Sequence, residues 1–181
     1  GDRALGVEPA EVTDVLFTHL HFDHVGWATQ RGEVVFPNAT YRVHQADWDH
    51  FMTGPDAEPG AIRKLSPLTE RLATFDSDHT VLPGLDARAA PGHTPGTTIY
   101  VASGDGARAL LLGDVVHSVV ELTEADWDAV FDVDPIAARA VRDALREEIV
   151  DSGDVVAPAH LPGLAWGRVV TVGSRREFIQ V

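Results

Sequence analysis

Three histidines and one aspartate stand close together near the start of the chain. They are His19, His21, Asp23 and His24, within the run from Thr18 to Gly26. If the chain is extended here, His19 and His21 point to the same side, because strand side chains alternate with a period of two. Asp23 and His24 then turn away and offer a second cluster beside the first. Imidazole nitrogens and carboxylate oxygens at close quarters are ligands that zinc accepts, so this run predicts a metal site.

Three further candidate ligands follow in the chain. His93 stands in a loop rich in Gly and Pro, which is turn chemistry that presents one imidazole. Asp114 and His160 each end a short apolar run that reads as a buried strand. Taken singly, these residues could be a turn residue, a strand-end cap and a half-buried ring. Their joint order and setting after the first cluster favour metal ligands.

The His-x-His-x-Asp-His run, followed by these three residues in this order, resembles the signature of the metallo-β-lactamase fold hydrolases. The resemblance covers nearly the whole chain. It implies that His19, His21 and His93 hold one metal ion, that Asp23, His24 and His160 hold a second, and that Asp114 bridges them. Two zinc ions are the expected cofactors, although manganese, iron or cobalt would suit the same donors.

The resemblance also implies the fold, an α/β αββα four-layer sandwich. We expect one domain over residues 1–181. Relatives carry several strands before the His-x-His motif, whereas only 18 residues precede it here. The chain is therefore expected to be a fragment without the N-terminal strands, which leaves the first sheet incomplete. An unpaired sheet edge is an aggregation hazard.

Local patterns predict alternating strands and helices, as layered α/β architecture requires. Pro135 to Asp151 is the clearest helix, because its apolar residues form one stripe and proline suits its first turn. A hairpin turn is expected at Gly104 to Gly106. Helices are further predicted over residues 45–52 and 61–75, and strands over residues 15–17, 33–36, 41–43, 80–82, 85–89, 97–102 and 108–112.

Composition limits the partners. The 181 residues carry 14 basic and 28 acidic side chains, a net charge of -14, which should repel nucleic acid and anionic membranes and argues against a nuclease. No apolar run approaches the roughly 20 residues that span a bilayer. Cysteine is absent, which fits a reducing cytoplasm, and the excess of Arg over a single Lys fits a bacterium with GC-rich genes. Homo-oligomer formation stays open, and the expected partner is a small-molecule substrate.

The expected activity is hydrolysis of a small ester or lactone by hydroxide bound to two zinc ions. The segment after Asp114 resembles lactonases and organophosphorus hydrolases such as methyl parathion hydrolase. A phosphotriester or phosphodiester hydrolase, a glyoxalase II-like thioesterase, an iron-dependent oxygenase and a non-catalytic partial domain are the alternatives. The resemblance gives Asp23 a second role as proton relay to the leaving group.

Other side chains near these motifs leave their roles open. His117, three residues after Asp114, either faces the cleft and orients substrate or stands in solvent. Phe22 and Trp27 flank the first motif, and core packing is favoured over a role as walls of an apolar pocket. The histidines that match no motif position are expected at the surface: His44, His50 and His79.

Overall fold

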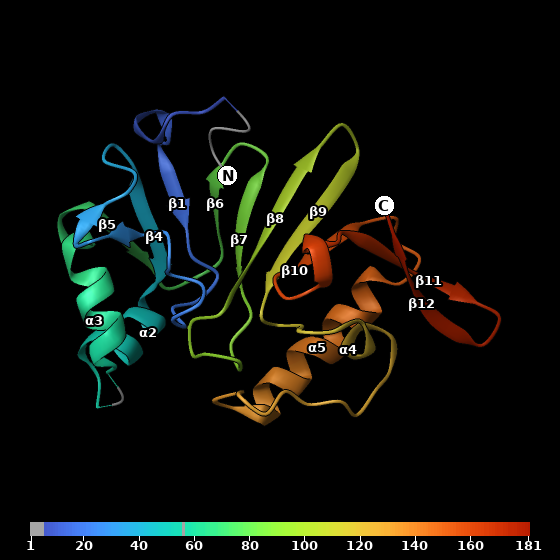
Figure 1. Cartoon of the computed structure of the whole chain (residues 1–181). Helices are drawn as coiled ribbons and strands as arrows, with labels where there is room; N and C mark the ends of the chain where they lie inside the picture. Colours follow the sequence, from blue (N-terminus) through green and yellow to red (C-terminus); the bar gives the residue numbers. More distant parts are fainter. Residues whose placement is uncertain (1–5, 56) are drawn as a thin grey trace. The chain divides into compact units, whose positions relative to one another are not determined.

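The chain folds into two compact units, Gly1–Asp76 and Ser77–Val181. The computed structural model describes residues 6–55 and 57–181 (Figure 1). Each unit combines β-sheet with helices, so the expectation of a mixed α/β fold is confirmed. Among the described residues, no helix is both long and apolar enough to cross a bilayer.

Unit 1 is built on a small parallel sheet with strand order β1-β4-β5. Its core collects apolar side chains from the strands, from the helices and from the first motif, where Leu20 and Val25 are fully buried. The elements of unit 1 are η1 (Pro9–Glu11), β1 (Asp14–Leu16), β2 (Thr29–Gln30), β3 (Glu33–Val34), β4 (Thr40–His44), α2 (Gln45–Trp48), η2 (Asp49–Thr53), α3 (Pro59–Leu65), η3 (Ser66–Arg71) and β5 (Leu72–Phe75).

Unit 2 is built on a seven-stranded sheet with order β12-β11-β10-β9-β8-β7-β6. Helix α5 buries Leu145 and Ile149 in the same cluster as sheet residues such as Leu110 and Val156, and α4 and α5 lie together in Figure 1. The elements of unit 2 are β6 (His79–Leu82), β7 (Leu85–Ala89), β8 (Thr98–Gly104), β9 (Ala107–Gly113), α4 (Val119–Thr123), α5 (Pro135–Ile149), β10 (Val155–Pro158), η4 (Pro162–Leu164), β11 (Gly167–Val172) and β12 (Arg175–Gln180).

Most of the predicted elements are confirmed, and the hairpin turn at Gly104 to Gly106 has positive φ at Asp105 and Gly106, as a tight turn requires. The helix predicted over residues 61–75 is wrong in its last part. Leu72–Phe75 is the strand β5, which pairs in parallel with β4 and takes its backbone hydrogen bonds from that partner. Pairing with a distant strand is tertiary context that overrides local periodicity.

One further strand is shorter than predicted, and some elements have no counterpart in the prediction. The strand expected over residues 33–36 is only Glu33–Val34, because it pairs in a two-residue hairpin with β2. The C-terminal hairpin of β11 and β12 and the short helix α4 were not predicted at all. Most of β12 and the second half of β11 are exposed, so neither strand has the continuous buried apolar run that identifies a core strand.

Candidate metal centre

The candidate ligands of unit 1 stand on the loop that leaves β1. Backbone pairing ends after Phe17, whose N–H still donates to the carbonyl of Arg42. The next residues belong to no strand, so the two histidines stand on a loop rather than on the strand itself. The loop is held by the buried carboxylate of Asp47 on α2, which accepts the N–H of Leu20 at 2.9 Å. Asp47 was not predicted, because nothing in the sequence links it to the motif.

This loop nevertheless brings the four side chains of unit 1 together. The ring of His19 lies 4.9 Å from that of His21 and 4.0 Å from that of His24, between centroids. His24 Nε2 lies 3.5 Å from Asp23 Oδ2. His19 is buried, whereas the Asp23 side chain is 60% exposed. The ligand atoms of His19 and His21 lie within 4.8 Å of each other, as do those of Asp23 and His24.

The candidate ligands of unit 2 meet because of the sheet topology. Strands β9 and β10 are parallel neighbours, so Asp114 and His160, which follow them, leave the sheet at the same edge. The loop between β7 and β8 stands at that edge too, since β8 runs antiparallel to both β7 and β9. His93 is in this loop, which is braced by the N–H of Thr94 donating to Thr97 Oγ1 at 2.8 Å.

Three imidazoles of unit 2 converge on one carboxylate oxygen. Asp114 Oδ2 lies 3.5 Å from His93 Nε2, 3.3 Å from His117 Nε2 and 3.1 Å from His160 Nε2. Zinc–ligand bonds of about 2.0–2.1 Å in tetrahedral geometry place neighbouring ligand atoms roughly 3.3 Å apart. The donor types and their spacing in unit 2 therefore fit a zinc-type cation.

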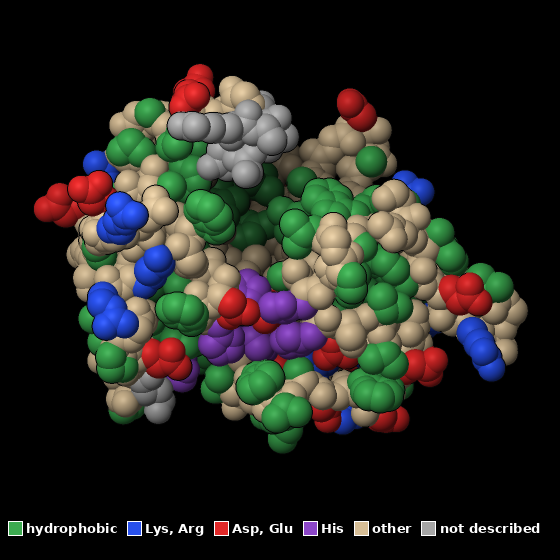
Figure 2. Space-filling view, in the orientation of Figure 1, with side chains coloured by type: hydrophobic (Ala, Val, Ile, Leu, Met, Phe, Trp, Pro, Cys, Tyr) green, Lys and Arg blue, Asp and Glu red, His purple; other side chains and the backbone are tan. Residues whose placement is uncertain are grey.

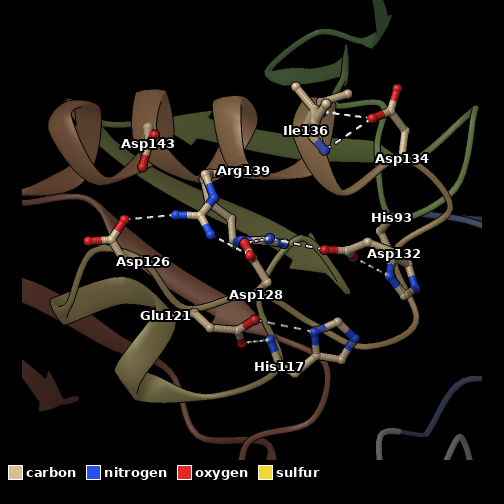
Figure 3. Close-up of polar contacts among 12 residues, drawn as sticks. His93, His117, Glu121, Asp126, Asp128, Asp132, Asp134, Ile136, Arg139 and Asp143 are labelled. Atoms are coloured by element: carbon tan, nitrogen blue, oxygen red, sulfur yellow. Dashed lines mark hydrogen bonds and ion pairs between the residues drawn. The ribbon is translucent and has the colours of Figure 1, made fainter.

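His93 is oriented by buried ion pairs that link it to Asp132, just before α5, and to Arg142 on α5. Its Nδ1 lies 3.1 Å from Asp132 Oδ1, and Asp132 Oδ2 accepts from Arg142 at 2.9 Å. The Asp132 and Arg142 side chains are 0% and 1% exposed. Figure 3 shows Asp132 directed at His93, with Asp128 and Arg139 farther out. A carboxylate on Nδ1 fixes which ring nitrogen faces a metal, so Nε2 is the ligating atom.

The same contacts shift the pKa of Asp132. Burial alone would raise it, but hydrogen bonds from His93 and Arg142, together with their charges, outweigh burial and hold the pKa below the ordinary value. Asp132 is therefore ionised at neutral pH. Neither Asp132 nor Arg142 was predicted. The only sequence signal was the acidic stretch just before the proline that starts α5.

His117 lies beside the candidate ligands rather than in open solvent, and its side chain is 24% exposed. Its Nδ1 is 3.7 Å from Glu121 Oε1, and Glu121 Oε2 accepts the N–H groups of His117 and Ser118 (Figure 3). Burial would lower the pKa of His117, but the hydrogen bonds and charges of Asp114 and Glu121 raise it to about 9. Glu121, buried at the first turn of α4, was not predicted; it follows Ser118 by three residues, the spacing of a capping box.

The three histidines expected at the surface are half-buried, and each has a local contact. His44 caps α2 by accepting the N–H of Ala46 and lies edge-on to Phe75. His50 lies edge-on to Phe51, and His79 Nδ1 is 3.1 Å from the carbonyl of Ser77.

The expectation that Phe22 and Trp27 pack into the core is wrong. Phe22 is 67% exposed and Trp27 is 75% exposed. The residues of this motif that do enter the core of unit 1 are Leu20 and Val25.

Residues 2–160 match the family model of the metallo-beta-lactamase superfamily. The chain belongs to this superfamily. It is 48% identical over 64 residues to the N-acyl homoserine lactonase AttM of Rhizobium johnstonii (strain DSM 114642 / LMG 32736 / 3841), a match that covers 34% of this chain and 22% of that relative. Curated relatives of this kind are thus matched over only part of their length.

Solved structures of the superfamily show the same fold. The hydrolase AbOPH superposes with a TM-score of 0.88 and 25% identity, covering 99% of this chain and 67% of that chain. AidC, a dizinc quorum-quenching lactonase in complex with its product N-hexnoyl-L-homoserine, superposes with a TM-score of 0.85 and 24% identity, covering 98% of this chain and 67% of that chain. The metallo-beta-lactamase fold expected from the sequence is confirmed.

Proposed function

We propose that this chain is the metal-binding part of a dinuclear zinc hydrolase that acts on a small ester or lactone. The observation that carries the proposal is the approach of His93 Nε2 and His160 Nε2 to Asp114 Oδ2, at 3.5 and 3.1 Å, which is ligand-to-ligand spacing. The chain belongs to a superfamily whose members include N-acyl homoserine lactonases. This membership supports an ester or lactone substrate over a phosphoester or thioester substrate.

In this proposal the two units act as one domain and share the metal pair. His19, His21 and His93 would hold one ion, Asp23, His24 and His160 would hold the other, and Asp114 would be shared between them. The donors present, five imidazoles and two carboxylates besides a neighbouring His117, suit zinc without any thiolate. When bound, such a pair acidifies water and polarises the oxygen under attack.

The remaining roles belong to side chains of this chain. Asp132 keeps His93 Nδ1 protonated and directed away from the metal position. His117, braced by Glu121, can donate a hydrogen bond to a substrate oxygen beside Asp114. Asp23, which is largely exposed, can carry a proton to the leaving group.

Paired hydrolysis assays test the proposal. The zinc-loaded chain is assayed with an N-acyl homoserine lactone, an aryl phosphotriester and an acyl thioester at equal concentration. We expect the lactone to be hydrolysed fastest and chelation to abolish the activity. If the phosphotriester or the thioester is hydrolysed fastest, the substrate is of that class and not an ester or lactone. If the zinc-loaded chain hydrolyses none of the three, the hydrolase assignment is refuted in favour of a non-catalytic domain.

A further inference from the structure

Two adjoining cavities open on the surface of unit 1, beside the first metal-binding motif. Their volumes are about 340 and 390 Å³, and they share Thr29, Arg31 and Lys64 in their walls. The first is bounded by Trp27 and the second by Phe22. We call the two together the basic groove; its polar and aromatic walls are formed by Phe22, Trp27, Thr29, Arg31, Arg63 and Lys64.

The groove concentrates positive charge in a chain whose net charge is -14. Among the residues that the structure describes, no carboxylate lines either cavity. Arg31 and Arg63 also make no ion pair with any described carboxylate, whereas Arg42, Arg88 and Arg108 each do. In Figure 2, several Lys and Arg side chains show on the face of unit 1 that carries α3. With twice as many acidic as basic side chains available, unpaired cations in one hollow are unexpected unless a ligand neutralises them.

The local backbone holds these cations in place. Arg31 and Gly32 form the two-residue turn between β2 and β3, and both have positive φ, 53° and 83°. Asn or Asp is usual before Gly in such a turn, and arginine adopts this conformation less readily. The ammonium of Lys64 donates one hydrogen bond to the carbonyl of Thr29, and Thr29 Oγ1 donates to the carbonyl of Lys64. Two of the three ammonium N–H groups of Lys64 are thus left for a ligand.

The aromatic side chains give the groove an apolar flank. Phe22 and Trp27 are the exposed rings described above, and a Cβ added at Gly60 would lie 4.0 Å from Phe22 Cδ2, so this ring leans over the start of α3. Exposed aromatic rings beside arginine and lysine suit a ligand that has an apolar body and a negative end.

We propose that the basic groove binds an anionic amphiphile, a molecule whose single carboxylate or phosphate contacts the three cations and whose apolar part lies against the two rings. The groove is formed by unit 1 alone, and binding there needs neither metal nor turnover. The inference therefore stands or falls separately from the hydrolase proposal.

Calorimetric titration of the zinc-free full chain with 4-phenylbutyrate, 4-phenylbutyl phosphate and the uncharged 4-phenylbutanol tests this inference. We expect the acid or the phosphate to bind at least about tenfold more tightly than the alcohol, since the oxyanion adds two or more ion pairs. The tighter of the two anions identifies the ligand head group. Equal binding of the alcohol, or no binding of either anion, would overturn the proposal.

A matched pair of double variants locates the site. Arg31→Gln/Arg63→Gln should weaken binding of the anion about tenfold and remove most of its dependence on salt. Arg71→Gln/Arg175→Gln changes the net charge equally at exposed positions outside the groove and should leave affinity within about twofold. Trp27→Phe should abolish the change in tryptophan fluorescence on binding. Equal loss in both double variants would mean that the anion responds only to overall charge, which contradicts a site in the groove.

Discussion

At the scale of single residues, the candidate centre depends on how each imidazole is oriented. His93 is buried with one nitrogen on Asp132 and the other beside Asp114. Asp132 in turn is paired with the buried guanidinium of Arg142. In this row of three side chains, each charge compensates that of its neighbour. Removal of one charge therefore leaves another buried without compensation.

Asp132→Asn should therefore lower both the affinity for zinc and the stability of the folded chain. We expect an affinity for zinc lower by about 10–100-fold, because the amide orients His93 poorly. The free energy of unfolding should fall by about 3–5 kcal/mol, since Arg142 loses its buried partner. Competition with a chromophoric chelator and denaturant unfolding measure the two effects. Asp128→Asn, on the more exposed side of Arg142, is the control and should change zinc affinity little.

His117 should affect turnover more than metal binding, because it lies beside Asp114 and the proposal does not make it a ligand. His117→Gln keeps a hydrogen-bond donor and should lower kcat about 10-fold or more while zinc affinity stays within a few-fold. Glu121→Gln should have a similar but smaller effect, as Glu121 holds the ring from behind. Steady-state kinetics and metal analysis on the same samples separate the two quantities. Loss of one zinc ion in His117→Gln would instead make His117 a ligand.

At the scale of elements, the His93 loop and the start of α5 are packed backbone to backbone. The N–H of Asp134 donates to the carbonyl of Gly92, and that of Val133 to the carbonyl of His93. Gly92 has φ of 143°, and a Cβ there would lie 2.3 Å from the N atom of Ala138. Only glycine permits this approach, which places the metal-binding loop against the helix.

Gly92→Ala should separate the loop from α5. We expect a loss of roughly 3 kcal/mol or more in the free energy of unfolding, together with weaker zinc binding, because the added Cβ meets backbone that cannot yield. Gly104→Ala is the matched control, since a Cβ there meets nothing within 4 Å and its φ is not positive. If both variants unfold at the same denaturant concentration, the His93 loop and α5 do not pack so closely that position 92 requires glycine.

The sequence singled out residues that the structure brings together within each unit, and it predicted their local geometry less well. Residues that end buried apolar strands, Asp114 and His160, were recognisable because strand ends have a pattern. Asp132 and Arg142 were not recognisable, because their contact with His93 joins segments far apart in the chain. The strand β5 was missed for the same reason: its partner β4 lies some thirty residues earlier. Glu121 was missed although it follows Ser118 at the spacing of a capping box. The exposed rings of Phe22 and Trp27 were misplaced because aromatic residues are usually buried.

At the scale of the whole molecule, ion pairs between carboxylates and arginines make stability depend on pH. The hydrogen bond from Arg108 outweighs burial and holds the pKa of Asp154 below its ordinary value, and the hydrogen bond from Arg42 does the same for Asp14. A lowered folded-state pKa gives stability that is complete above the unfolded pKa of about 3.9 and is lost as the pH falls through the folded value.

Asp154→Asn should therefore be less stable than the unaltered chain at pH 7, by no more than about 1 kcal/mol because water screens the half-exposed Arg108. The difference should shrink below about pH 4 and vanish once Asp154 is protonated in both states. Denaturant unfolding from pH 3 to 7 gives the comparison. If the difference in stability between Asp154→Asn and the unaltered chain instead grows toward low pH, the pKa of Asp154 is not lowered by folding.

The central claim is that candidate ligands of both units hold the same pair of metal ions. Zinc content after equilibrium dialysis tests it most directly. The unaltered chain should bind about two zinc ions, and His19→Ala and His93→Ala about one each. Because the proposal assigns these two histidines to the same ion, their double variant should still bind about one, whereas His19→Ala/His160→Ala should bind almost none. Loss of both ions in His19→Ala/His93→Ala would show that each unit binds its own metal, and would contradict the shared centre.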